Sequence, residues 1–190
     1  MGFDSKLYCI IMASGYGKRF GSDKLTASFK GVPLCEYVFA NHPSELFHST
    51  IVVARTAEVA LSACAHHLTV AENLDDKDDI AATIRLGMSF VPKDAFGCMF
   101  SVCDMPYFTQ ESVNKLTAAF AQDRSCIVAP RSADGHASPV IFPQSTFEEL
   151  ASLPPNTSGN AVIKRHLDKL RLVDIDENEL RDIDLPQDMV

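Results

Sequence analysis

Short apolar runs alternate with amphipathic stretches along the first two thirds of the 190-residue chain, and this alternation restricts the fold more than any other feature. The apolar runs predict buried strands at Leu7–Met12, Thr50–Arg55, Leu68–Ala71, Gly97–Asp104 and Ser125–Pro130. The amphipathic stretches between them predict helices at Pro33–His42, Ala57–His67, Ile80–Val91 and Thr109–Gln122. This order is typical of an α/β fold with a doubly wound, mostly parallel sheet and helices on both faces.

The pattern changes after Pro130. One more strand is expected at Ser138–Pro143, helices are expected at Ser145–Leu153 and Asn160–Leu170, and a short last strand is expected at Leu170–Asp176. Because the sequence contains no repeat, low-complexity tract or linker, residues 1–190 are predicted to form a single domain.

Charge and hydropathy exclude several classes of function. The net charge of −8 argues against a nucleic-acid partner, and the apolar runs are too short to span a membrane. The N-terminus lacks the features of a signal peptide, and none of the six cysteines forms a C-x-x-C pair. We therefore expect a cytoplasmic protein with buried, reduced thiols.

The first predicted strand ends in a turn of small and basic residues. The turn contains small residues that would let backbone N–H groups approach phosphate oxygens, namely Ala13, Ser14, Gly15 and Gly17. It also contains three cations, Lys18, Arg19 and Lys24. Neither the dinucleotide fingerprint nor the P-loop pattern fits these positions. Cations at a phosphate-binding turn suit phosphoryl-group chemistry, although a solvated turn with incidental basic residues would look similar.

Carboxylates occur at two further places. Asp104 stands at the end of a predicted buried strand, where it could bind Mg²⁺ beside a triphosphate or simply end the strand in a turn. The C-terminal stretch contributes Asp182, Asp184 and Asp188, one of which could complete a metal site. Ligands bind at the carboxyl ends of parallel strands, so we expect Asp104 to lie near the first turn.

Taken in order, these motifs resemble those of the molybdenum cofactor nucleotidyltransferases, especially the cytidylyltransferases. The family pattern reads L-A-A-G-x-S-x-R-M-G-x-x-K-L, G-x-P-L, C-D-M-P, G-H-P-V-L-F and D-I-D-T-P-E-D. Its counterparts here are Met12–Leu25, Gly31–Leu34, Cys103–Pro106, Ser138–Phe142 and Asp182–Asp188. The resemblance implies a Rossmann-like, GT-A-like nucleotidyltransferase fold with an antiparallel strand near the fifth predicted strand.

The resemblance also implies a reaction and a set of residue roles. CMP would pass from CTP to molybdopterin phosphate of the molybdenum cofactor with release of pyrophosphate, and the product would serve hydroxylases of the xanthine dehydrogenase type. Nucleotide-binding roles would fall to Ala13, Ser14, Gly15, Gly17, Lys18, Ala82 and Thr83. Arg19, Lys24 and Asp104 would be catalytic, with Asp104 and Asp184 as Mg²⁺ ligands. Weaker matches place the second substrate at Ser138, Gly159, Asn160 and Lys164.

Three departures from the family pattern keep alternatives open. Ser14 stands where cytidylyl enzymes typically have alanine, the segment Asp78–Gly87 differs from the usual base-recognition motif, and Ser138 replaces a histidine, with His136 nearby. One alternative is a guanylyl- or sugar-phosphate nucleotidyltransferase on the same fold. Another is a non-catalytic carrier of the molybdenum cofactor.

Overall fold

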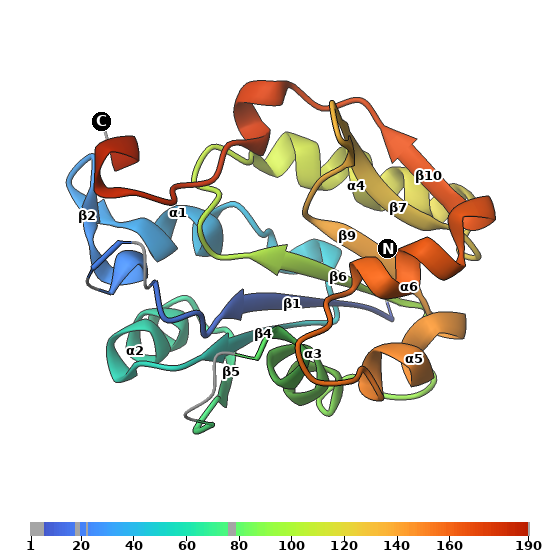
Figure 1. Ribbon diagram of the computed structural model, residues 1–190, viewed down its shortest axis with the longest axis horizontal. Helices are drawn as coiled ribbons and strands as arrows, with labels where there is room; N and C mark the ends of the chain where they lie inside the picture. The colour runs from blue at the N-terminus through green and yellow to red at the C-terminus, as the bar shows by residue number, and fades with distance from the viewer. Residues whose placement is uncertain (1–5, 18–19, 22, 76–78, 190) are drawn as a thin grey trace.

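A central mixed sheet organises the computed structural model, which describes residues 6–17, 20–21, 23–75 and 79–189 (Figure 1). The strand order is β10-β7-β9-β6-β1-β4-β5. The strands are β1 (Leu7–Ala13), β4 (Ser49–Ala54), β5 (Thr69–Glu72), β6 (Gly97–Val102), β7 (Ile127–Ser132), β9 (Val140–Pro143) and β10 (Leu170–Val173). A short strand β8 (Gly135–His136) pairs with β7, and β2 (Ser28–Phe29) forms a separate hairpin with β3 (Val32–Pro33).

The helices follow the strands closely in sequence. They are α1 (Leu34–Ala40), α2 (Ala57–Ala65), α3 (Ile80–Met88), α4 (Gln110–Gln122), α5 (Phe147–Ala151) and α6 (Asn160–Arg165). Short 3-10 turns occur at Lys24–Thr26, Ser44–Leu46, Gln144–Thr146, Leu167–Lys169, Glu177–Leu180 and Pro186–Met189. Among the helices of the described ranges, none has the length and apolar character needed to cross a membrane.

The pairing of the strands confirms the predicted sheet. β1 lies between β4 and β6 and is parallel to both, so that Ile10 is opposite Ile51 on one side and Phe100 on the other. β9 is antiparallel to its neighbours β6 and β7, with Val140 opposite Phe100. The sheet is therefore mostly parallel, with the antiparallel strand β9 inserted beside the fifth predicted strand and the short β8 also antiparallel to β7.

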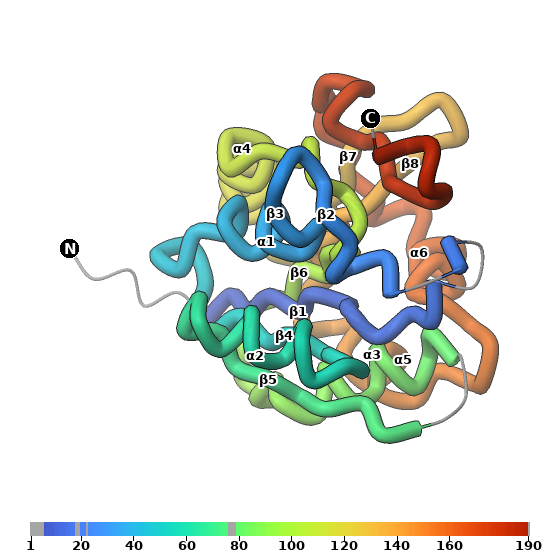
Figure 2. Tube along the Cα trace, turned by 90° about the vertical axis from the view of Figure 1, so that its left-hand side faces the viewer, coloured from blue at the N-terminus to red at the C-terminus, as the bar shows by residue number. Residues whose placement is uncertain are grey.

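Helices cover both faces of the sheet, as expected for a doubly wound fold (Figure 2). Successive residues of a strand point to opposite faces, and β1 is apolar on both. Ile11 packs into a core with α1, α2 and α4, while Ile10 packs into a second core with α3, α5 and α6. Burial on both sides explains why β1 reads as a continuous apolar run.

Two features differ from the sequence-based expectation. The helix expected over Asn160–Leu170 ends at Arg165, because His166 leaves helical geometry at φ −126° and ψ 37°. The β2–β3 hairpin was not predicted, because two-residue strands are too short to show a period. Its turn at Lys30 and Gly31 has positive φ at both residues, 47° and 94°.

The carboxyl ends of β1 and β6 meet the C-terminal segment at one edge of the sheet (Figure 1). The backbone N–H of Cys103 donates to Met12 O at 3.2 Å, which holds the two strand ends together. The backbone N–H of Ile183 donates to Asp104 O at 2.9 Å and ties the C-terminal segment to the end of β6. Segments that are far apart in sequence are thereby brought to one place.

Candidate active site

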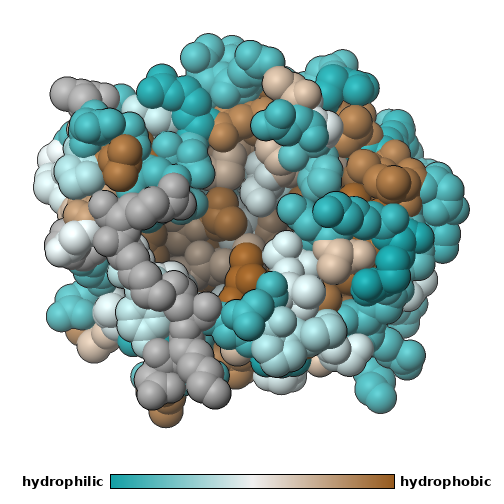
Figure 3. Space-filling model, in the orientation of Figure 1, coloured by the Kyte–Doolittle hydropathy of each residue, from teal (hydrophilic) through white to brown (hydrophobic). Residues whose placement is uncertain are grey.

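A cavity of about 520 Å³ lies at this edge of the sheet. The residues that line it are Met12, Ser14, Gly15, Tyr16, Gly17, Lys24, Leu25, Asp79, Ile80, Thr83, Val102, Cys103, Asp104 and Asp184. The face shown in Figure 3 is hollowed near its centre, with apolar residues on the floor of the hollow and hydrophilic residues around it. The cavity is concave and has a few convergent polar groups, which is typical of a small-molecule site.

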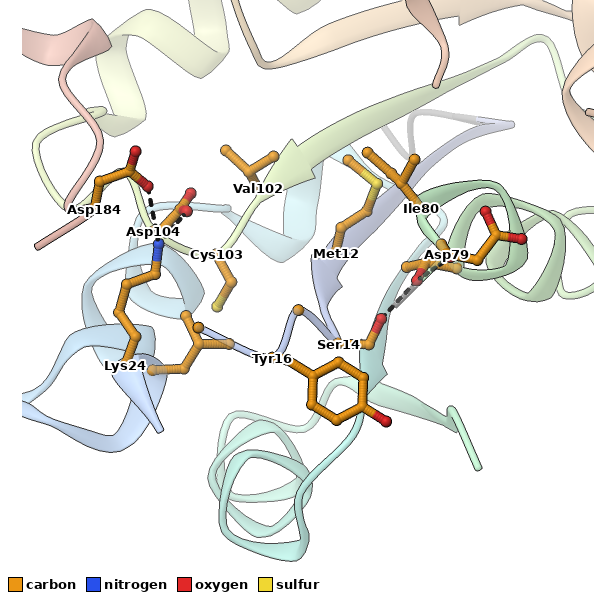
Figure 4. Close-up of a pocket in the computed structure, with 14 residues that line it drawn as sticks. Met12, Ser14, Tyr16, Lys24, Asp79, Ile80, Val102, Cys103, Asp104 and Asp184 are labelled. Atoms are coloured by element: carbon orange, nitrogen blue, oxygen red, sulfur yellow. Dashed lines mark hydrogen bonds and ion pairs between the residues drawn. The ribbon is translucent and has the colours of Figure 1, made fainter. Parts of the chain in front are cut away.

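One end of the cavity is charged. Lys24 Nζ lies 2.6 Å from Asp104 Oδ2 and 3.7 Å from Asp184 Oδ1 (Figure 4). The side chains are 12%, 25% and 34% exposed respectively, so that water screens them only in part. The first turn, the end of β6 and the C-terminal segment thus contribute one charged group each to a shared cluster.

Backbone hydrogen bonds hold the two carboxylates beside each other. The contact from Ile183 N–H to Asp104 O sets the position of Asp184, the next residue. Asp188 Oδ2 accepts from the backbone N–H of Asp184 at 3.1 Å and of Leu185 at 2.7 Å. Asp188 therefore orders the turn that presents Asp184. Asp184 lines the cavity, whereas Asp182 does not.

Asp23 orders the backbone around Lys24. It is the N-cap of the 3-10 turn Lys24–Thr26, and its Oδ1 accepts from Leu25 N at 3.1 Å. Its Oδ2 accepts from Thr56 Oγ1 at 3.0 Å, which links the turn to the N-terminus of α2. Asp23 was not predicted as part of the site, although an aspartate directly before a helical turn is a recognisable capping signal.

The other end of the cavity, called the neutral end below, is formed by uncharged polar side chains that lie beside the capping carboxylate of Asp79. Ser14 Oγ and Thr83 Oγ1 lie 2.6 Å apart, and the buried Asn73 donates from Nδ2 to both, at 3.2 Å and 3.4 Å. The three residues come from the end of β1, the end of β5 and the first turns of α3. Figure 4 shows Ser14 on the opposite side of the cavity from Lys24, with Met12 and Val102 between them.

Arg55 holds the glycine-containing turn against its neighbours. Its Nε donates to Ser14 O at 2.7 Å, and its guanidinium lies 4.0 Å from the centre of the Tyr16 ring. Its Nη1 donates to Tyr16 Oη at 3.0 Å and to Asp75 O. Gly17 has φ 56°, a conformation that favours glycine, and its carbonyl accepts from Phe20 N at 2.8 Å. Lys18 and Arg19 lie outside the described residues.

The carboxylate of Asp79, at the start of α3, accepts hydrogen bonds from the backbone. Its side chain caps the helix by accepting from Ala81 N at 3.0 Å, and it also accepts from Asn156 N at 2.9 Å. These backbone N–H groups, that of Asn156 first, lower the pKa of the Asp79 carboxyl, and Arg85 Nη2 at 3.4 Å adds to the effect. Asp79 is thus a helix cap that also lines the cavity.

A second cavity of about 190 Å³ adjoins the first and shares Met12, Ile80 and Val102 with it. The remaining lining residues are Ile84, Phe100, Ser138, Val140, Phe142, Leu150, Ser158, Gly159, Asn160 and Ile163. Three of the four residues predicted for the second substrate are among them. His136 contacts one of these three, with Nε2 3.2 Å from Asn160 Oδ1. Lys164 is exposed on α6 and does not line this cavity.

The structure brings most of the predicted site residues together. Those that line the main cavity are Ser14, Gly15, Gly17, Lys24, Thr83, Asp104 and Asp184. Ala13 is buried in β1 and Ala82 lies on α3, and neither lines the cavity. Sequence patterns did not predict a role at the site for Asn73, Tyr16 or Arg55.

Asp104 and Asp184 are the residues that could hold a metal ion. Mg²⁺ typically takes one or two carboxylates and completes its shell with water and substrate phosphates. The two carboxylates share one cationic partner, Lys24, so a divalent cation would find the same pair of ligands. In the described part of the chain, no cluster of three or more His, Cys, Asp or Glu side chains is suited to a metal. The donor set therefore fits a metal that arrives with phosphate ligands.

Comparison with known families agrees with this geometry. A family model described as MobA-like NTP transferase domain matches residues 9–170. The chain belongs to the MobA-like NTP transferase family. It is therefore a nucleotidyltransferase. A comparison with curated protein sequences found no significant match.

Solved structures share the fold of this nucleotidyltransferase at low sequence identity. A homolog of Mycobacterium tuberculosis Rv0371c from Mycobacterium sp. strain JC1 is 21% identical, with a TM-score of 0.81 over 97% of this chain and 93% of that one. Rv0371c from M. tuberculosis H37Rv, in complex with manganese, is 19% identical, with a TM-score of 0.71 over 89% and 88%. A CMP:2-keto-3-deoxy-manno-octonic acid synthetase complexed with CTP is 14% identical, with a TM-score of 0.71 over 96% and 95%.

Proposed function

We propose that this nucleotidyltransferase transfers CMP from CTP to the molybdenum cofactor and releases pyrophosphate. The dinucleotide product would then serve as the cofactor of a hydroxylase of the xanthine dehydrogenase type. The observation that carries the transfer chemistry is the meeting of Lys24, Asp104 and Asp184 at one end of a cavity whose other end presents the hydroxyl groups of Ser14 and Thr83. A triphosphate suits the first end, and a nucleobase suits the second.

The protein's part in the reaction is to position the substrates and to stabilise charge. Asp104 and Asp184 would hold the Mg²⁺, which when bound neutralises phosphate charge. Lys24 would leave the carboxylates for the β- and γ-phosphates and stabilise the departing pyrophosphate, with Arg19 assigned the same role by its motif. The acceptor phosphate attacks the α-phosphate in line, so the chain needs no nucleophile of its own.

The second cavity supports a heterocyclic acceptor. None of the described residues that line it is charged, and most of them are apolar. A neutral pterin ring could bind there while its phosphate reaches the main cavity past Met12, Ile80 and Val102. A sugar phosphate, which offers hydroxyl groups along its whole length, would leave many of them unpaired against these walls. This contrast favours molybdopterin over the sugar-phosphate alternative.

Two lines of support favour CTP as the donor. The motifs Cys103–Pro106 and Asp182–Asp188 follow the cytidylyl branch of the resemblance, since guanylyl enzymes more often have threonine in place of Met105. A solved neighbour of this fold was crystallised with CTP. Mg²⁺ is proposed on the donor set, and the manganese complex of Rv0371c shows that a protein of this fold can hold a divalent cation.

Pyrophosphate release tests the proposal. The protein with Mg²⁺ is incubated with each of CTP, GTP, ATP and UTP, and with either molybdenum cofactor or a sugar phosphate as acceptor. We expect release with CTP and molybdenum cofactor, and loss of that release in the Asp104→Ala variant. Tight cofactor binding without pyrophosphate release from any nucleotide would instead identify a non-catalytic carrier.

A further inference from the structure

The two segments that carry the carboxylates of the charged end run side by side in opposite directions. They are the C-terminal segment 179–184 and the loop 104–109, which connects β6 to α4. Three contacts join them, and these contacts pair Asp104 with Ile183, Tyr107 with Arg181, and Thr109 with Glu179. Residue numbers rise along one segment as they fall along the other, as in two antiparallel strands. The register of these contacts determines which residue of the C-terminal segment lies beside Asp104.

Glu179 makes the contact that lies farthest from the cavity end of the two segments. Its Oε2 accepts from the backbone N–H of Thr109 at 2.9 Å and from Thr109 Oγ1 at 2.8 Å. Thr109 is the N-cap of α4, and its Oγ1 also accepts from Ser112 N at 3.2 Å. Hydrogen bonds to a carboxylate are stronger than those between neutral groups, and a helix N-terminus attracts negative charge. Glu179 therefore attaches the C-terminal segment firmly to the start of α4.

Arg181 makes the middle contact. Its guanidinium carbon lies 5.5 Å from the centre of the Tyr107 ring, and Lys30 Nζ lies 5.1 Å from the same ring centre. Arg181 is exposed, and a cation–π contact at an exposed site is weak. Arg181 should therefore add less to the attachment of the segment than Glu179 does.

Ile183 makes the contact nearest to the cavity. Its side chain is 1% exposed in the core that also contains α1, α2 and α4, and its backbone N–H donates to Asp104 O. A shift of the segment by one residue would move an aspartate into this apolar position, which is costly. This contact fixes one point of the segment. A second attachment, four residues earlier at Glu179, fixes the direction in which the segment enters the site.

We propose that Glu179 is a positioning residue for the metal–triphosphate site: by binding Thr109, it holds the C-terminal segment in the direction that keeps Asp184 beside Asp104. Glu179 lines neither cavity, so it would act through the segment and not on a substrate. This inference rests on the proposed function, because it requires Asp104 and Asp184 to share one metal ion.

Calorimetric titration of CTP in the presence of Mn²⁺ tests the proposal without any acceptor. Glu179→Ala should weaken binding about tenfold, the lower end of the loss that follows when an outer partner of a metal ligand is removed. Glu179→Gln keeps a side-chain oxygen that can accept from Thr109, so its affinity should stay within about threefold of that of the unmodified protein.

The same substitution in the Asp184→Asn background separates positioning from general support of the fold. With no carboxylate left at position 184 to hold in place, Glu179→Ala should weaken binding there by less than about twofold. A residue that only stabilised the fold would cause the same loss in both backgrounds.

Asp123 provides a matched control at the opposite end of α4. Its Oδ1 accepts from the backbone N–H of Ser125 at 2.9 Å and from Ser125 Oγ at 2.6 Å, the same pair of hydrogen bonds that Glu179 accepts from Thr109. Asp123→Ala should leave the affinity for CTP with Mn²⁺ within about twofold. Arg181→Ala should weaken it about threefold, and this exposed substitution keeps the test valid should Glu179→Ala fail to fold.

The possible failures have different meanings. Unchanged affinity in Glu179→Ala would overturn the inference and leave the transferase proposal standing. An equal loss in the Asp184→Asn background would also overturn it, because Glu179 would then only support the fold. If the unmodified protein does not bind CTP with Mn²⁺, or if Asp184→Asn binds like the unmodified protein, the proposed site itself fails, and the inference fails with it.

Discussion

The two ends of the nucleotide cavity are built in opposite ways. At the charged end, Lys24, Asp104 and Asp184 remain 12–34% exposed and come from three distant segments. At the neutral end, Ser14, Asn73 and Thr83 are 3–6% exposed and satisfy one another's hydrogen bonds. Partly solvated ionic groups can exchange partners when a metal and phosphates enter, whereas a buried hydrogen-bonded network holds its side chains in place. The first arrangement suits chemistry, and the second suits the binding of a nucleobase.

Asp104→Asn should lower the activity more than any other substitution proposed here, and it should impair only the charged end. Loss of a carboxylate from the proposed metal site should lower the rate of pyrophosphate release by roughly 10²–10³-fold. The CTP-to-UTP affinity ratio should remain, because the neutral end is intact. The control is Glu111→Gln, which removes an exposed carboxylate paired with Lys115 at 2.9 Å. An equal fall in the rate of pyrophosphate release in that control would show that the effect comes from the change in net charge and not from a metal site.

Lys24→Met should separate two roles of the charged end. Transfer should fall by about 10²-fold because the phosphates lose a cation. Binding of Mn²⁺ to the nucleotide-free protein, followed by electron paramagnetic resonance, should become tighter, because the ammonium no longer lies 2.6 Å from Asp104 Oδ2. Weaker Mn²⁺ binding would show that Lys24 supports the metal site instead of competing for it.

Gly159→Leu should weaken binding of the acceptor and leave both ends of the nucleotide cavity unchanged. Gly159 has φ −54°, which any residue adopts, and a Cβ there would lie 3.1 Å from Phe142 Cζ. A longer side chain would fill part of the second cavity, so the KM for molybdenum cofactor should rise about tenfold. The dissociation constant of CTP should not change. A weakened CTP affinity would mean that the two cavities act as one.

Arg55→Lys should have the smallest effect. Lysine keeps the charge but loses the planar group that contacts Ser14 O and stacks on Tyr16. The turn should become looser, and CTP and UTP should both bind roughly threefold to tenfold more weakly. Calorimetry on both nucleotides checks this outcome. A change in their ratio would show that Arg55 takes part in selecting the base.

The charged end could be predicted from the sequence and the neutral end only in part. Lys24 and Asp104 each follow a recognisable strand end, and Asp184 lies in an ordered motif. Asn73 follows a four-residue strand and looks like any turn asparagine. Its role depends on β5 placing it between β1 and α3, a contact that no local pattern encodes.

The same distinction applies to the fold. Long apolar strands such as β1 and β6 were predicted within a residue or two, because burial on both faces leaves a continuous signal. Lys164 was expected near the second substrate, but Val162 and Ile163 turn the buried face of α6 inward and leave Lys164 exposed. Orientation around a short helix depends on tertiary packing, which the motif alone does not contain.

A double-mutant cycle on metal–nucleotide binding tests most directly whether the charged end is one site. The affinity of Mn²⁺ with CTP is measured by calorimetry for the unmodified protein, Asp104→Asn, Asp184→Asn and the double variant. If both carboxylates act on one cation, each single change weakens binding, and the double change costs clearly less than the sum. Additive losses, or an Asp184→Asn variant that binds like the unmodified protein, would contradict a shared metal–triphosphate site.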